Sequence, residues 1–336
     1  MLAPHFRSTD GVAPNLAALS FVLIGWPVGI LLLTRSDWFF VLAGFFLVSL
    51  TLIWSAYFIH EFAHYSIFKS PDSNRRWGTL MSWINGSCVA SFDSLRRKHV
   101  RHHVERADVL TFDVQGFLQR IPAVFRQIVL VLEWLYFPAV EFLMRGFVVA
   151  RAWRKGGLAR WRVVAILMTR ISLFALLGWL SPLTLLLYFG AYLVMLTVLR
   201  FADCFQHTYE AYPIDDDTPL PQELVRDKVY EQANTYTNVV GLNNFWLNLI
   251  WLNFGYHNAH HERPIVPWHR LPMLHRELYG DSYGQVVTMP ELLRAFHHHR
   301  VRRVLAPDYG QILGVGELRR ADGFIGAVGV SFLTAV

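Results

Sequence analysis

Apolar and polar residues follow one another along this chain in long blocks, a pattern typical of helices that cross a membrane. Each apolar run is long enough to span the hydrocarbon core of a bilayer. The runs come in two pairs, and a short polar break separates the two runs of each pair, at 34–37 and at 181–182. The pattern therefore predicts an all-α integral membrane protein with about four transmembrane helices. The four predicted spans are residues 16–33, 38–59, 163–180 and 183–202.

The region between the second and third spans, residues 60–162, is rich in Lys and Arg. The connection at 34–37 carries a single basic residue, Arg35. Because basic loops stay on the cytoplasmic side, we expect residues 60–162 and the N-terminus to lie in the cytoplasm. The short loops favour a bacterial inner membrane as the setting. We expect residues 1–310 to form one domain with a cytoplasmic helical cap, followed by a C-terminal tail at 311–336.

The composition supports a membrane protein and argues against other classes. Hydrophobic residues make up 54% of the chain and charged residues 17%, which is too apolar for an ordinary soluble protein. The net charge of +6 comes from basic residues clustered between apolar runs, which indicates membrane topology rather than a nucleic-acid partner. Two cysteines, Cys88 and Cys204, are too few for a disulfide scaffold or a cysteine-ligated iron–sulfur cluster.

Three clusters of histidine form the clearest chemical signal in the chain. The first reads HxxxH and the other two read HxxHH. Positions i, i+3 and i+4 share one face of a helix, so each cluster points its imidazoles in one direction. Neutral imidazole is a common ligand for transition metals. The clusters are His60/His64, His99/His102/His103 and His257/His260/His261.

Eight histidines are too many for one tetrahedral ion and suggest a pair of metals. His207 is a ninth candidate, and Asp203 lies four residues before it, on the same helix face if the fourth span continues. We expect residues 239–256 to form a half-buried helix that leads into the third cluster. Asn253 lies in this stretch, four residues before His257. Asn253 and Glu61 are further candidates for the outer shell of a metal site. Two ions held by neutral nitrogens at a membrane surface suit O₂ chemistry with iron.

The first cluster also allows a different interpretation. His60-Glu-Phe-Ala-His64 fits HExxH, the pattern of zinc proteases in which the glutamate is the general base. An intramembrane zinc protease would leave both HxxHH clusters unexplained. A transporter that only binds metal is a third possibility, but the predicted spans hold few polar groups near the bilayer midplane.

The full set of motifs resembles the membrane fatty acid desaturase superfamily. The order HxxxH, HxxHH, HxxHH on four spans carries the resemblance, together with Gln206-His207-Thr208 and the segment from His257 to Pro264. It covers roughly residues 40–275. In acyl-CoA desaturases of this superfamily an Asn stands four residues before the isolated histidine, where this chain has Asp203.

The resemblance implies a non-haem di-iron centre, O₂ as the oxidant and a fatty acyl substrate, either as the free acid, an acyl thioester or a lipid. It implies hydrogen removal from an unactivated C–H bond, most directly desaturation. Decarboxylation of a free fatty acid to a 1-alkene, or hydroxylation, would use the same scaffold. The iron ligands implied by the resemblance are His60, His64, His99, His102, His103, His207, His257, His260 and His261.

Electrons are expected from a separate protein of the ferredoxin or rubredoxin type. Some superfamily members carry a fused cytochrome b5 domain, but this chain has no His-Pro-Gly-Gly segment and no CxxC pair. A basic stretch in the second cluster offers a docking face for an acidic donor, although lipid headgroup contact explains it equally well. This stretch contains Arg96, Arg97, Lys98 and Arg101.

Overall fold

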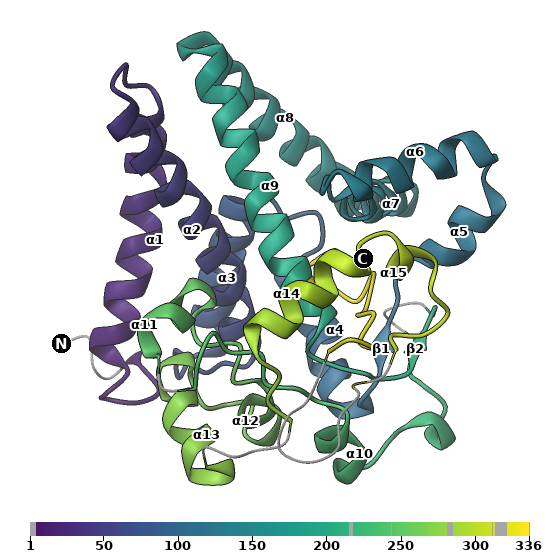
Figure 1. Cartoon of the computed structure of the whole chain (residues 1–336). Coiled ribbons are helices and arrows are strands. Elements are labelled where there is room, and N and C mark those ends of the chain that lie inside the picture. The colour runs from purple at the N-terminus through teal and green to yellow at the C-terminus, as the bar shows by residue number, and fades with distance from the viewer. Residues whose placement is uncertain are drawn as a thin grey trace. The chain divides into compact units, whose positions relative to one another are not determined.

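The computed structural model describes residues 5–214, 218–242, 244–280, 285–310, 312 and 321–335. Internal contacts divide the chain into two compact units. Unit 1 contains the residues up to Ser94 together with Phe147–Val198, and unit 2 contains Leu95–Gly146 and the residues from Leu199 to Ala335. Helices dominate the described part of both units (Figure 1).

Within the described residues, four helices are long and apolar enough to cross a membrane, which confirms the predicted all-α membrane fold. Asp37 starts the second of them, because its side chain accepts a hydrogen bond from the Phe39 backbone N–H at 2.8 Å. Ser181 alone separates the last two. The four helices are α1 (Val12–Leu33), α2 (Trp38–Ala63), α8 (Gly157–Leu180) and α9 (Pro182–Cys204).

Small residues let α1 and α2 pack closely within unit 1 (Figure 1). A Cβ at Gly44 would lie 2.8 Å from the Gly29 carbonyl oxygen, and a Cβ at Gly29 would lie 2.8 Å from the Val48 side chain. Any larger residue would push the two backbones apart, as in other membrane helix pairs that meet at glycine. Helix α3 (Pro71–Asn85) packs beside α2 in the same unit.

Unit 2 is built from short helices and one small sheet. Among the described helices, three cross the unit boundary: α4 (Phe92–Glu105), α7 (Ala139–Lys155) and α9. The other α-helices are α5 (Val114–Arg120), α6 (Ala123–Trp134), α10 (Lys228–Ala233), α11 (Phe245–Asn248), α12 (His257–Glu262), α13 (Leu271–Tyr279), α14 (Met289–His298) and α15 (Arg302–Leu305). The short 3₁₀ helices are η2 (Gln222–Leu224), η3 (Leu249–Trp251), η4 (Trp268–Arg270) and η5 (Phe332–Thr334).

Two apolar clusters hold these helices in place. The first joins α5, α7, α15 and the C-terminal segment through Val114, Leu118, Val140, Met144, Val304 and Val328. The second packs α12 against α13 through Val239, Tyr256, Ala259, Leu271 and Leu274. Because α12 has only six residues, this packing rather than its own helix propensity holds it in shape.

Backbone pairing in unit 2 brings three distant segments together. Strand β1 (Asp108–Val109) follows α4 and pairs in parallel with β2 (Ala211–Tyr212), with Asp108 opposite Ala211. An antiparallel bridge joins His207 to Thr235. The end of the second histidine cluster, the segment after α9 and the end of α10 therefore lie side by side.

One expectation about local structure is wrong. Residues 239–256 do not form one helix that leads into the third cluster: α11 and η3 cover only 245–251, and Leu252 and Asn253 then have φ values of 48° and 57°. The buried amide of Asn248 instead accepts a hydrogen bond from the Val240 N–H and donates to the Gly241 carbonyl, which holds the chain in a loop.

The predicted C-terminal tail lies partly within the structure. Residues 321–335 belong to unit 2, and Phe324 in this segment is fully buried. Residues 311, 313–320 and 336 lie outside the described residues.

Candidate metal centre

The first histidine cluster lies at the end of α2 in unit 1. The rings of His60 and His64 lie 4.8 Å apart between centroids, and His60 is 1% exposed. Glu61 between them is also buried, and its carboxylate accepts a hydrogen bond from the Ser66 hydroxyl at 2.7 Å. A glutamate acting as a general base would have to face a reacting water, whereas this carboxylate is held by its own loop.

The second and third clusters lie on helices of unit 2, as their spacing predicts. His99, His102 and His103 share one face of α4, and α12 begins at His257 and presents His260 and His261. Helix α9 ends at Cys204, so His207 lies beyond it and is held by its bridge to Thr235. The chain thus reaches this histidine in an extended segment, not on a continued helix.

Four ring nitrogens from three segments converge in one part of unit 2. The Nε2 atom of His207 lies 3.1 Å from that of His102 and 2.8 Å from that of His257. The ligand atoms of His102, His207 and His261 all lie within 4.8 Å of one another. We call these four histidines the first group.

Acceptors on the far side of three of these rings decide where their protons reside. The Nδ1 atom of His102 lies 3.2 Å from both a carboxylate oxygen of Asp108 and the carbonyl oxygen of Ala107. The Nδ1 atom of His261 lies 2.9 Å from the carboxylate of Glu231. Because an ionised carboxylate can only accept a hydrogen bond, each of these Nδ1 atoms carries the proton.

The third ring is fixed in the same way by a hydroxyl group. Thr235 donates its hydroxyl proton to the Glu231 carbonyl oxygen at 2.7 Å, so its oxygen acts as an acceptor toward the Nδ1 atom of His207 at 3.3 Å. Tyr209 packs on His207 with ring centroids 4.1 Å apart and holds the same Thr235 oxygen at 2.9 Å. The Nε2 lone pairs of all three rings are therefore left to face inward.

Lone pairs that converge at this distance repel one another unless a cation lies between them. The Nε2 atom of His261 is buried and makes no hydrogen bond to any described residue. Such an atom is costly in the fold unless a ligand satisfies it. The first group therefore fits a transition-metal ion, and the acceptors behind the rings match the outer partners that metal-binding histidines use.

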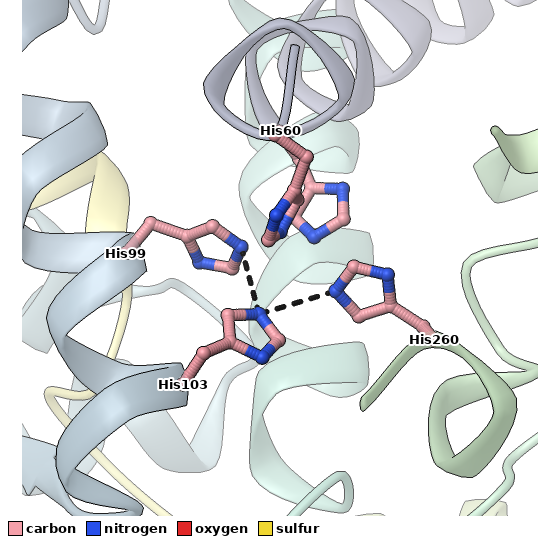
Figure 2. Close-up of side chains that lie close together, drawn as sticks. His60, His99, His103 and His260 are labelled. Atoms are coloured by element: carbon pink, nitrogen blue, oxygen red, sulfur yellow. Dashed lines mark hydrogen bonds between the residues drawn. The ribbon is translucent and has the colours of Figure 1, made fainter. Parts of the chain in front are cut away.

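A second group of ring nitrogens lies in the same unit. The Nε2 atom of His103 lies 3.2 Å from that of His99 and 3.2 Å from that of His260 (Figure 2). One N–H cannot satisfy both contacts at once, because neutral imidazole has a single N–H. His99, His103 and His260 thus form a second convergent set, and the His103 ring lies 4.2 Å from that of His261 in the first group.

Burial keeps two rings of the first group neutral, those of His207 and His261. Desolvation, and then the neighbouring histidines, lowers the pKa of His207 and His261 well below the ordinary histidine value. A low pKa leaves the imidazole nitrogen free to bind a metal ion at neutral pH.

Glu231 connects the site to the surface of unit 2, and sequence reasoning did not identify it. Its second carboxylate oxygen lies 3.1 Å from Arg106 Nε and 3.1 Å from Lys228 Nζ. Asp108 was also missed. Neither residue stands at a ligand spacing from a histidine, because the β1–β2 pair and the fold of α10 bring them to the site. The one available signal was for Asp108, an acidic residue five positions after His103.

A cavity of about 50 Å³ borders the histidines. Its polar wall includes Lys98, Asp203 and Gln206, and its apolar wall includes Phe254 and Phe332. Asp203 therefore lines the same space as His207, although α9 ends before the turn on which this prediction relied. The histidines at this cavity are His99, His102, His207 and His257.

The two predicted outer residues differ in their contacts. The buried side chain of Asn253 donates to the Trp268 carbonyl at 3.4 Å. One carboxylate oxygen of Glu61 accepts from Ser66, and the other lies 3.4 Å from the Nδ1 atom of His60. The predicted docking face is wrong for two of its four residues. Lys98 is 4% exposed and donates to the Thr111 hydroxyl at 2.8 Å, while Arg101 pairs with Glu105 on α4 at 2.5 Å.

Comparison with known proteins also indicates a fatty acid desaturase. The family model for fatty acid desaturases matches residues 36–292, which covers more than half of the chain and all nine histidines. A search of curated proteins finds no match.

Proposed function

The chain belongs to the fatty acid desaturase family, and we propose that it is an O₂-dependent enzyme that uses two non-haem irons to desaturate a fatty acyl chain. Family membership makes it a desaturase-like oxidoreductase with a fatty acyl substrate in a lipid environment. The observation that carries the di-metal proposal is the pair of convergent nitrogen groups in unit 2, with carboxylates behind His102 and His261.

We propose all nine histidines as iron ligands. His60 and His64 are included on the strength of the family pattern. Asp203 is placed to accept a hydrogen bond at the cavity wall, and Asn253 and Glu61 stay predicted outer residues. We place the site on the cytoplasmic side of a bacterial inner membrane, in keeping with the basic residues of 60–162.

Bound iron and O₂ would supply the oxidising power needed to break an unactivated C–H bond. The overall reaction removes two hydrogens from adjacent carbons and reduces O₂ to two waters, with two electrons and two protons from outside. A separate ferredoxin- or rubredoxin-type protein would supply the electrons. The chain's own contribution is to hold the Nδ1 protons at Asp108, Thr235 and Glu231 and to shield the site with apolar side chains such as Phe254.

The experiment is a single turnover of the anaerobically purified protein with O₂ and C12 to C18 chains, supplied as free acids, CoA thioesters and carrier-protein thioesters. Mass spectrometry reads both the lipid and the headspace. An internal alkene supports the proposal. A volatile 1-alkene with CO₂, or an alcohol, would assign the chain to a decarboxylase or a hydroxylase. Absence of O₂ consumption would refute an oxygen-dependent enzyme.

A further inference from the structure

The C-terminal segment reaches the histidines although it lies beyond the family match, which ends at residue 292. Phe324 is buried against Phe205, with ring centroids 5.1 Å apart. The Ala327 N–H then donates to the Cys204 carbonyl at 2.9 Å, directly after α9. These contacts fix the segment on unit 2 before it enters the site.

The next residues form one wall of the cavity beside the histidines. Val330 and Phe332 line it, and the Phe332 ring lies 4.9 Å from the His99 ring. Lys98 Nζ donates to the Ser331 carbonyl oxygen at 3.2 Å, which ties the wall to the residue next to His99. The wall is therefore held in place at the cavity and cannot drift as a free chain end would.

We propose that Phe332 is a specificity-determining residue: it closes the cavity beside His99 and so sets how far the end of an acyl chain can pass beyond the histidines. The inference rests on the proposed function for its substrate class. Among the residues lining the cavity, the histidines and Asp108 belong to the metal centre, whereas Phe332 contributes only bulk. Like Val109, Phe254 and Val330 in the same lining, its side chain can vary without removing a ligand or a ligand's partner.

The size of the cavity makes this wall decisive. With a volume of about 50 Å³, the space admits only a small group. The chain end would lie against the apolar side of the cavity, which is formed by Val109, Phe254, Val330 and Phe332. One methylene more or less at an apolar pocket wall changes discrimination by roughly 10- to 200-fold. Replacing the benzyl group of Phe332 with a methyl group makes room for one or two further methylenes, so it should alter selectivity at least about tenfold.

The test is a graded series, Phe332→Leu, Phe332→Ala and Phe332→Trp, with two readouts. The first is the position of the new bond after a single turnover. The second is the binding of C12 to C18 fatty acids to the metal-free protein, measured calorimetrically. We expect the Ala variant to place one or two more carbons between the reacted carbon and the chain end in the cavity. Its preferred chain length should increase, the Leu variant should be intermediate, and the Trp variant should shift in the opposite direction.

Phe324→Leu is the matched control, since it trims a buried aromatic ring of the same segment that is not part of the cavity lining. This variant should keep the wild-type bond position and binding profile. An unchanged chain-length profile across the Phe332 series would overturn the inference, whether or not the protein holds iron. If the wild type binds no iron but the fatty-acid binding profile still shifts across the Phe332 series, the proposed function is refuted and the wall assignment stands.

Discussion

Replacing Glu231 with Gln tests whether the carboxylate behind His261 serves the metal centre. Glu231 is 2% exposed, and one of its oxygens lies 2.9 Å from the His261 Nδ1 atom. The Gln side chain keeps the size and can still accept that hydrogen bond. It lacks the negative charge that makes the imidazole a stronger ligand, and it presents an uncharged amide to Arg106 and Lys228.

The expected effect on metal affinity follows from comparable sites. Removing an outer partner of a metal-binding histidine weakens metal binding by about 10- to 100-fold, which corresponds to roughly 1.4–2.7 kcal/mol. Breaking a fully buried ion pair would cost about 3–5 kcal/mol of folding free energy. The side chains of Arg106 and Lys228 are 25% and 43% exposed, so water can solvate them and the folding cost should fall below that range.

The assay is anaerobic iron titration against a competing chelator, alongside thermal unfolding of the metal-free protein. The matched control is Glu262→Gln, since Glu262 also faces Lys228, at 3.5 Å, but its side chain is 37% exposed. The control should bind iron like the wild type. If Glu231→Gln also retained wild-type iron affinity, the role assigned to this carboxylate would be refuted.

Three further predictions concern the same centre. Replacing Asp108 with Asn should weaken iron binding about 10- to 100-fold in the same titration, because Asp108 lies behind His102. Replacing His102 or His260 with Ala should abolish iron binding and activity together, whereas a zinc protease confined to HExxH would survive either change; metal analysis with O₂ uptake decides. Because burial lowers the pKa of His207 and His261, the unfolded chain binds more protons below pH 6.5 than the folded one. The metal-free protein should therefore lose up to about 1.4 kcal/mol of stability per pH unit for each ring as the pH falls below that value, measured by thermal unfolding; no loss between about pH 7 and 5.5 would contradict it.

Local periodicity made most of the helical scaffold predictable. The apolar runs predicted the four spans, and the ends of the four helices in the structure lie within a few residues of the predicted ends. The direction of His99, His102 and His103 follows from helix geometry alone. The spans and the direction of these histidines depend only on residues close together in the chain, so both can be predicted from a single sequence.

Long-range pairing made the rest of the site unpredictable. Asp108 and Glu231 reach the histidines through a parallel strand pair and a bridge between His207 and Thr235. Phe332 reaches His99 from more than 200 positions away. The prediction for Asn253 failed for a different reason. The apolar stretch at 239–256 predicted one helix, but the Asn248 side chain holds part of the stretch in a loop. No local pattern specifies such contacts.

The most direct test of the di-iron centre is the metal content of the anaerobically purified protein, combined with Mössbauer spectroscopy after loading with ⁵⁷Fe. We predict about two irons per chain, with nitrogen-rich coordination, and the loss of both signals in the His102→Ala variant. One tightly bound zinc per chain, with no iron uptake and no O₂ consumption, would contradict the account.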